Sequence, residues 1–204
     1  PPTPVDDTYS LDEDDVLSVD AAAGVLANDT DPESDPLEAA LVTGPMKGVV
    51  YLAADGSFIY TPNADANGTD SFTYAAQDGY SASTATVHLT INPVNDPPEL
   101  TIPLTDQQAI SGLGFTYSFP ADAFIDMDGD ALTYTAELDG GEPLPAWLNF
   151  NASNRRFWGL APDLGTTYTI IVTAADPGGL TASDTFLLEV LYLPEHVFLP
   201  AILR

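Results

Sequence analysis

The sequence predicts an all-β protein built from two β-sandwiches in tandem. Apolar and polar residues alternate along many short segments, and 18 prolines and 15 glycines separate these segments. The pattern occurs in two successive sets, one on each side of a proline-rich stretch at residues 92–98. Alternation is typical of half-buried strands, and many short strands at this spacing are typical of sandwiches.

In the first set, residues 84–91 carry the clearest alternation. Ala85, Val87, Leu89 and Ile91 share one face, and His88 lies on the opposite, outward face. The other strands expected in this set cover residues 37–42, 48–52, 57–60 and 71–76. Turn signals such as Asp55-Gly56 lie between them.

In the second set, residues 168–174 and 186–190 show the same period. The further strands expected here cover residues 132–137, 147–150 and 156–160. Between the two sets, three prolines in residues 92–98 fix the backbone and remove amide donors, so we expect a short, stiff linker. The predicted domains are residues 1–96 and 97–193, followed by an apolar tail at 194–204.

Charge excludes several functions. The chain has 31 acidic residues against 4 basic ones, a net charge of −27, and both halves are acidic. Such a surface repels nucleic-acid phosphates and anionic lipids, and it attracts cations. There is no cysteine and there are only two histidines, so disulfides and zinc are not expected. The sequence shows no membrane-spanning run of apolar residues and no signal peptide. If the protein is secreted, we expect this sequence to be its processed form.

The acidic residues concentrate in loops. Asp126-x-Asp128-Gly129 can direct two carboxylates to one centre, and calcium prefers such oxygen ligands. A single motif of this kind is also common in solvated turns, and it is no EF-hand because its twelfth position, Glu137, falls on a predicted strand. The motif has an apparent counterpart in the first set, since Asn28-Asp29-Thr30-Asp31 parallels Ile125-Asp126-Met127-Asp128.

Two acidic sets follow from the expected sandwich ends. Several carboxylates in one place repel one another unless a cation offsets their charge, so each set predicts a Ca²⁺ site. The set at the domain junction comprises Glu13, Asp70, Asn95, Asp96, Asp126, Asp128 and Asp176. The second set, at the N-terminal end, comprises Asp6, Asp7, Asp29, Asp31 and Asp78. It is expected either to bind an ion weakly by itself or to share one with a neighbouring molecule.

Residues 5–98 resemble the tandem cadherin-like repeats of bacterial surface proteins. The similarity rests on Gly24-Val25-Leu26-x-Asn28-Asp29-x-Asp31, Asp55-Gly56-Ser57-Phe58-x-Tyr60 and Val94-Asn95-Asp96-x-Pro98. Residues 99–191 resemble the dystroglycan-type cadherin-like domain, through Phe124-x-Asp126-x-Asp128-Gly129-Asp130 and Leu144-Pro145-x-Trp147-Leu148. The resemblance implies Greek-key sandwiches outside the cell, stiffened by calcium at the junction.

The predicted function is that of an extracellular or cell-surface, calcium-binding structural or adhesive protein, and not of an enzyme. Its expected partners are proteins, either further copies of itself or other surface proteins, and no nucleic acid. The tail either folds back or adds as a strand to another subunit, and in the second case the chains would assemble head to tail into a filament. The alternative is a calcium-dependent carbohydrate-binding module. Trp147 is expected in the core, whereas Trp158 beside Arg155-Arg156 has either a core or a surface position.

Overall fold

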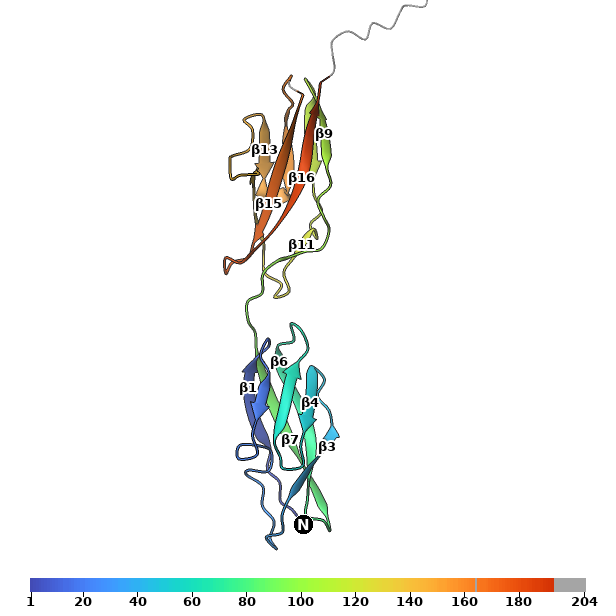
Figure 1. Cartoon of the computed structure of the whole chain (residues 1–204), viewed down its shortest axis with the longest axis vertical. Coiled ribbons are helices and arrows are strands. Elements are labelled where there is room, and N and C mark those ends of the chain that lie inside the picture. Colours follow the sequence, from blue (N-terminus) through green and yellow to red (C-terminus); the bar gives the residue numbers. More distant parts are fainter. Residues whose placement is uncertain (164, 193–204) are drawn as a thin grey trace, which may run out of the picture. The chain divides into compact units, whose positions relative to one another are not determined.

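The computed structural model describes residues 1–163 and 165–192 and divides into two compact units (Figure 1). Unit 1 is Pro1–Asn95, and unit 2 begins at Asp96. Each unit is described by itself below. Both are built from strands, and the helical segment among the described residues is the single 3-10 turn η1 (Ala152–Asn154). The predicted all-β tandem fold is confirmed.

Unit 1 consists of two facing sheets. The larger has the order β1-β7-β6-β3 and the smaller the order β2-β5-β4. Strand β1 runs parallel to β7, and the other neighbouring strands pair antiparallel. The strands are β1 (Asp7–Asp12), β2 (Leu17–Val19), β3 (Glu38–Thr43), β4 (Gly48–Leu52), β5 (Phe58–Pro62), β6 (Gly68–Gln77) and β7 (Ala82–Asn92).

The core of unit 1 lies between these sheets. Alternate residues of β7 face inward and are buried, as the sequence predicts: Ala85, Val87, Leu89 and Ile91. Phe58 of β5 packs edge-on against Phe72 of β6, with ring centroids 5.5 Å apart. Burial of these faces holds the two sheets together, because apolar area removed from water is the main stabilising contribution to a sandwich.

Unit 2 repeats this arrangement. Its sheets have the orders β12-β15-β16-β9 and β10-β14-β13, and β8 pairs with β11 in a small third sheet. Strand β9 runs parallel to β16, as β1 does to β7. The strands are β8 (Glu99–Leu100), β9 (Gln107–Ile110), β10 (Gly114–Ser118), β11 (Phe124–Ile125), β12 (Thr133–Leu138), β13 (Leu148–Asn151), β14 (Arg156–Leu160), β15 (Thr166–Ala175) and β16 (Thr181–Leu191).

The core of unit 2 is rich in aromatic rings. Phe157 of β14 is fully buried and contacts Phe186 of β16, with ring centroids 5.4 Å apart. Trp147 lies at the edge of this core, packs against Phe115 and Tyr168, and is partly buried as expected.

The strands that the alternation predicts are all present, with ends shifted by a few residues. Strands β1, β2, β8, β9, β10 and β11 are absent from the prediction. Four of them, β2, β8, β9 and β11, have four residues or fewer, and β1 places the acidic Asp7 at a buried position of its alternation. None of the described segments forms a helix long and apolar enough to cross a membrane. The apolar tail at 194–204 lies outside the described residues.

Candidate metal centre

The turn between β11 and β12 organises the acidic end of unit 2. Oδ1 of Asp126 accepts hydrogen bonds from the amides of Asp128 and Asp130, at 3.0 and 3.2 Å. Gly129 adopts a φ of 79°, which lets the chain turn back around the Asp126 carboxylate. The second oxygen, Oδ2, is buried, and among the described residues no donor reaches it. A buried carboxylate oxygen without a donor favours a cation as its partner.

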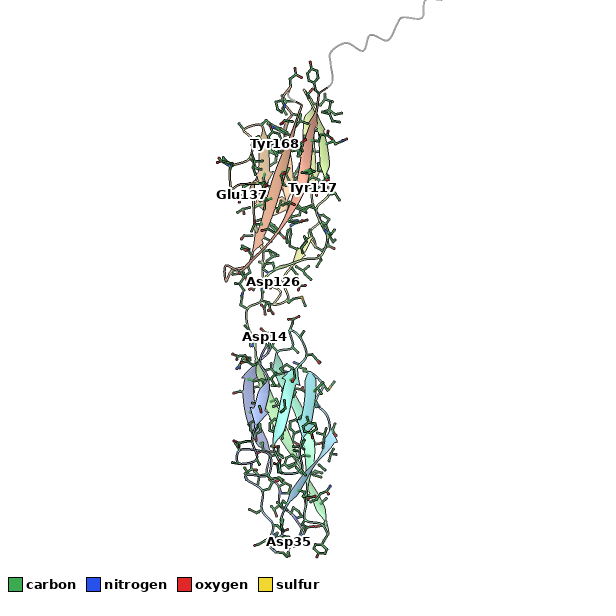
Figure 2. The ribbon with its side chains drawn as sticks, in the orientation of Figure 1. Asp14, Asp35, Tyr117, Asp126, Glu137 and Tyr168 are labelled. Carbon is green, nitrogen blue, oxygen red and sulfur yellow. The ribbon has the colours of Figure 1, made fainter. Side chains whose placement is uncertain are left out.

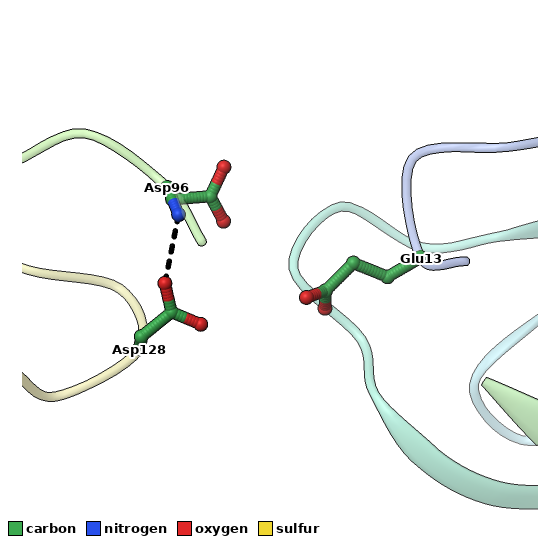
Figure 3. A group of neighbouring side chains, drawn as sticks. All are labelled: Glu13, Asp96 and Asp128. Atoms are coloured by element: carbon green, nitrogen blue, oxygen red, sulfur yellow. Dashed lines mark hydrogen bonds between the residues drawn. The ribbon is translucent and has the colours of Figure 1, made fainter. Parts of the chain in front are cut away.

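Asp128 connects this turn to the start of unit 2. Its Oδ2 accepts a hydrogen bond of 2.8 Å from the backbone amide of Asp96, which Figure 3 shows as a dashed line. The bond fixes the segment just before β8 against the Asp126 turn. Asp96 and Asp128, both expected at the junction, are therefore brought together within unit 2.

Asp176 lies at the same end of unit 2. It directly follows Ala175, which pairs with Thr133 at the start of β12, and the Asp126 turn leads into that strand. Asp176 is only 6% exposed, and its Oδ1 accepts a hydrogen bond of 2.8 Å from Leu180. Figure 2 places Asp126 at this end of unit 2, away from Tyr168.

Glu13 is the unit 1 carboxylate of the acidic set predicted at the domain junction. Its side chain is buried, with the residue 3% exposed, and lies against the chain that leaves β7. Oε1 accepts a hydrogen bond of 2.8 Å from the amide of Val94, and Oε2 accepts one of 3.3 Å from Asn67 Nδ2. Asn67 is not among the predicted site residues, because Asn67-Gly68 is a common turn sequence. Asn95 follows Val94 in the linker before Asp96.

Asp70 has a different role from the one expected. Its Oδ1 accepts hydrogen bonds from the amides of Met46 and Ser71, and its Oδ2 accepts from Lys47 N and the Tyr60 hydroxyl. Burial disfavours its charge, but these four donors outweigh burial and hold the pKa of Asp70 below its ordinary value. Four donors fill the lone pairs of one carboxylate, so Asp70 anchors the start of β4 and is left out of the ligand set that we propose.

At the opposite end of unit 1, Asp31 repeats the geometry of Asp126. Oδ1 of Asp31 accepts from the amides of Glu33 and Asp35, at 2.9 and 3.2 Å, and its Oδ2 is buried without a hydrogen-bond donor among the described residues. Ser34, at the position of Gly129, has a φ of 62°. The counterpart of Asp126 is therefore Asp31 and not Asp29, and the expected alignment of the two loops is wrong by two residues.

This correction adds two acidic residues to the N-terminal set. Glu33 takes the position of Asp128, and Asp35 that of Asp130. Neither residue was predicted, because the two loops were aligned by their Asp-x-Asp sequence motifs, and the hydrogen bonds that define the correct alignment are not visible in the sequence. Figure 2 shows Asp35 at one end of unit 1 and Asp14, the neighbour of Glu13, at the other.

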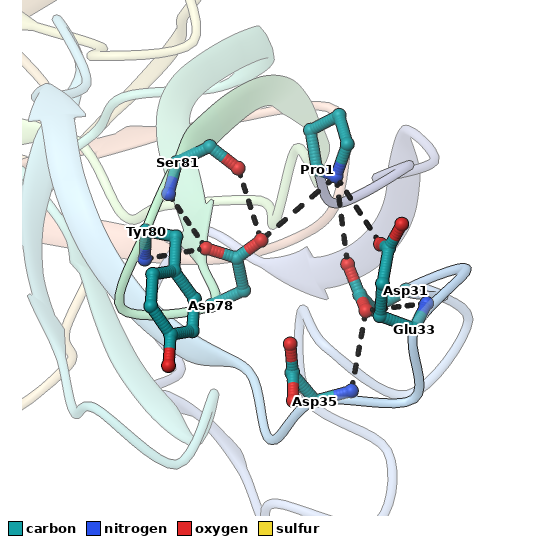
Figure 4. A network of polar contacts seen from close by, with 7 residues as sticks. All are labelled: Pro1, Asp31, Glu33, Asp35, Asp78, Tyr80 and Ser81. Carbon is teal, nitrogen blue, oxygen red and sulfur yellow. Dashed lines mark hydrogen bonds and ion pairs between the residues drawn. The ribbon is translucent and has the colours of Figure 1, made fainter.

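Asp78 lies close to Asp31, as Figure 4 shows. It follows the last residue of β6, as Asp176 follows that of β15. The amides of Ser81 and Tyr80 donate to its Oδ1, at 2.6 and 2.7 Å, and hold the pKa of Asp78 below its ordinary value. The nitrogen of Pro1 lies 3.9 Å from both Asp31 Oδ2 and Asp78 Oδ2, so the two carboxylates face the same point.

Asp7 and Asp29 form an inner pair around the hydroxyl of Tyr74. That hydroxyl donates to Asp29 Oδ2 at 2.9 Å, and Val5 N donates to Asp29 Oδ1 at 2.8 Å. Burial, together with the charge of Asp29, raises the pKa of Asp7 to about 6. Two carboxylates that share a buried place in this way repel each other unless a cation or a proton is added.

Asp6 does not join this set. Its Oδ1 accepts a hydrogen bond of 2.8 Å from Thr86 N, and its Oδ2 lies 3.8 Å from His88 Nε2. Both partners lie on the outer face of β7, whereas Asp7 pairs with the buried Val87. Neighbouring residues of a strand point to opposite faces, and this separates Asp6 from Asp7.

Each unit matches a known family of domains. Residues 1–93 match the family described as "Bacterial cadherin-like domain", and residues 97–191 match the family described as "Putative Ig domain". The chain therefore consists of cadherin-like and Ig-like domains in tandem. Domains of these classes imply an extracellular adhesive or structural role and are generally not enzymes.

Solved structures support the same fold. The chain is similar to human Protocadherin-24 EC1-2, with a TM-score of 0.59 and 17% identity, covering 93% of this chain and 98% of that one. It is also similar to human CDH23 EC21-23, with a TM-score of 0.55 and 17% identity, covering 91% and 67%. Among curated proteins, Integrin beta-like protein C of Dictyostelium discoideum is 29% identical over an alignment of 112 residues that covers 48% of this chain and 6% of that protein.

Proposed function

We propose that this chain is an extracellular, calcium-binding structural or adhesive protein, and that calcium rigidifies the junction between its two units. The proposed ligands at the junction are Glu13, Asn95, Asp96, Asp126, Asp128 and Asp176. Each offers carboxylate or amide oxygens, which calcium prefers. Family resemblance to cadherins supports the same ion, and we retain the dystroglycan-type assignment of residues 99–191 as part of this proposal.

One observation carries the proposal. Glu13 accepts a hydrogen bond from Val94 N, and Asp128 accepts one from Asp96 N. Val94 and Asp96 are two residues apart, so their Cα atoms lie within about 7 Å of each other, whatever the orientation of the units. The covalent chain alone thus keeps an acidic group of each unit close to the linker.

A bound divalent ion would offset the negative charges of the proposed ligands. Asp126 Oδ2 is buried without a donor among the described residues, and Asp176 is buried at the same end of unit 2. Within unit 2 these carboxylates repel one another when no cation is present. A divalent ion that binds them together converts this repulsion into a link between the units, which favours one interdomain angle.

The N-terminal set supports a second site. Its proposed ligands are Asp31, Glu33 and Asp78, with Asp7 and Asp29 behind them. The side chains of Asp31 and Asp78 are 1% and 5% exposed, and the two carboxylates lie around the nitrogen of Pro1. A cation bound between these two carboxylates would offset their charges.

Calcium titration of the full chain tests the junction site. Binding to the folded state raises the melting temperature with each increase in free calcium above the dissociation constant. The double variant Asp126→Asn/Asp128→Asn should lose most of this rise. Glu137→Gln serves as the control, because Glu137 is an exposed residue of β12 and not a proposed ligand. Equal calcium responses of the double variant and the wild type would refute the junction site.

We further propose that copies of this protein assemble head to tail into a filament through the apolar tail at 194–204, with other surface proteins as alternative partners. The tail offers Val197, Phe198 and Leu199 for addition to a sheet edge. Size-exclusion chromatography and electron microscopy of the full chain, against a chain that ends at Pro194, test this. Assembly that persists without the tail, or identical monomers from both chains, would contradict it.

A further inference from the structure

The outer face of the small sheet β10-β14-β13 in unit 2 has no role in the calcium proposal. Strand β14 is the central strand, and Trp158 projects from its outer side with 41% of its surface exposed. Thr116 lies directly opposite Trp158 on β10, and Asn149 lies opposite it on β13. A single indole on a flat sheet is thus flanked on both sides by polar groups that can form hydrogen bonds.

A guanidinium lies on the same face. Arg156 is two residues before Trp158 on β14 and is exposed. Its Nε donates a hydrogen bond of 3.0 Å to Thr116 Oγ1, the residue opposite Trp158, so the guanidinium leans along the strand toward the indole. Within the described part of the chain, no carboxylate forms an ion pair with Arg156.

The polar rim of the indole is held in place by its own hydrogen bonds. Asn149 Nδ2 donates to the backbone oxygen of Trp158 at 3.3 Å. Asn151 Oδ1 accepts from the amides of Ser153 and Asn154, which closes the η1 turn beside Arg156. A shallow hollow of about 270 Å³ lies between these groups and is lined by Asn151, Asn154, Arg156 and Trp158.

The charge of this face is opposite to that of the rest of the chain. The exposed strand residues on it are Gly114, Thr116, Ser118, Asn149, Asn151, Arg156, Trp158 and Leu160. None of them is acidic, although the chain has 31 acidic and 4 basic residues. The chain as a whole repels anions, but at contact distance an anionic group on this face meets the Arg156 guanidinium and no carboxylate from these strands.

We propose that this face binds an anionic polysaccharide. A sugar ring stacks on the indole of Trp158, its hydroxyls pair with Thr116 and the asparagine amides, and a carboxylate or sulfate of the sugar pairs with Arg156. Guanidinium groups bind both anions through two parallel hydrogen bonds. No acidic residue takes part, so this binding does not need calcium and is independent of the function proposed above.

Native gel electrophoresis of the full chain through polygalacturonate or chondroitin sulfate tests the proposal, with dextran as the neutral reference. The two acidic polymers distinguish carboxylate from sulfate. Each polymer is first tested in a calcium chelator, because calcium could bridge the acidic protein to an acidic polymer, and a second series of gels contains calcium instead. We expect at least one acidic polymer to retard the wild type, and dextran to leave it unchanged.

Substitutions on the outer face of the small sheet test whether that face binds the polymer. Trp158→Ala should weaken retardation about tenfold or more, as truncation of a central Trp does at binding surfaces. Trp158→Phe, which keeps a ring, should retain part of it, and Arg156→Gln should lose the preference for the acidic polymer. Tyr51→Ala is the matched control, because Tyr51 is an aromatic residue on β4 of unit 1 that is 72% exposed. Circular dichroism confirms that each variant is folded.

Three outcomes would overturn the proposal. These are equal retardation of Trp158→Ala and wild type, equal retardation by dextran and the acidic polymers, and retardation that appears only when calcium replaces the chelator. The last result would assign polymer binding to the acidic ends of the units, and it would leave the calcium proposal intact.

Discussion

Asp31 and Asp126 occupy equivalent positions in the two units. Each accepts hydrogen bonds at Oδ1 from the amides two and four residues later, and each keeps a buried Oδ2 that no described donor reaches. The segments before them also correspond, since Thr3 bridges to Thr30 as Glu99 pairs with Ile125. Pro1 therefore takes the position of Pro97, and the N-terminal end of unit 1 repeats the end of unit 2 that begins at Asp96.

This equivalence predicts two separable calcium sites. Asp31→Asn should remove binding at the N-terminal end only, and Asp126→Asn at the junction only, because the two turns belong to different units. Isothermal titration calorimetry of the single and double variants measures the loss of each class of site. If one substitution removed all calcium binding, the two ends would not be independent.

Glu13→Gln should weaken calcium binding without unfolding unit 1. Glutamine keeps an oxygen that can accept from Val94 N, but it lacks the charge that attracts the ion. We expect calcium affinity at the junction to fall by about tenfold or more, which corresponds to about 1.4 kcal/mol. The melting temperature in chelator is the control. A large drop in that temperature would mean that Glu13 mainly supports the fold.

Ser34 and Gly129 predict opposite effects on stability. Both have a positive φ, which costs little for glycine and of the order of 1 kcal/mol for serine. Ser34→Gly should therefore raise the free energy of unfolding, and Gly129→Ser should lower it, by about 1 kcal/mol each. Urea denaturation in chelator measures both. Changes of the same sign would contradict the equivalence of the two turns.

Asp70→Asn should destabilise unit 1 in a pH-dependent way. Because its four donors lower the folded-state pKa, the contribution of Asp70 is present above the ordinary carboxyl pKa of about 4 and is lost as pH falls through the lower folded value. We expect a loss of about 1–3 kcal/mol at neutral pH, because charged hydrogen bonds are replaced by neutral ones.

Urea denaturation of Asp70→Asn and wild type at pH 7 and pH 3 checks this expectation. The difference between the two proteins should shrink at the lower pH. Glu38→Gln, at an exposed position of β3, controls for the general effect of removing one negative charge. A difference that stays constant with pH would mean that the Asp70 charge does not contribute.

Gly159→Ala should destabilise unit 2, whereas Gly114→Ala should not. An added Cβ at Gly159 would lie 2.0 Å from the backbone oxygen of Trp147, so the strands would have to separate. At Gly114, on β10 of the same sheet, a Cβ would meet nothing within 4 Å. We expect a loss of about 1–3 kcal/mol for the first and little change for the second, measured by urea denaturation. Equal stabilities would show that the sheet adapts freely.

Much of the fold could be predicted from the sequence, because the alternation of apolar and polar residues is visible within a single strand. Alternation along residues 84–91 identifies β7, and its inward residues are buried as predicted. Two of the strands that were not predicted, β1 and β9, join the larger sheets by pairing in parallel with the last strand of their units. Such pairing joins residues about 80 positions apart, as Asp7 and Val87 do, and no local period reports it.

The candidate sites likewise combine features that the sequence predicts with features that depend on how the chain packs. The order of residues is enough to predict that acidic residues recur in loops at strand ends and that Trp158 lies close to two arginines. Packing of the chain is needed to see that four donors saturate Asp70, that Asp6 faces His88, and that Asp31 aligns with Asp126. The reason is physical: a residue's type fixes which bonds it can form, but whether a donor from a distant strand reaches it depends on how the chain packs.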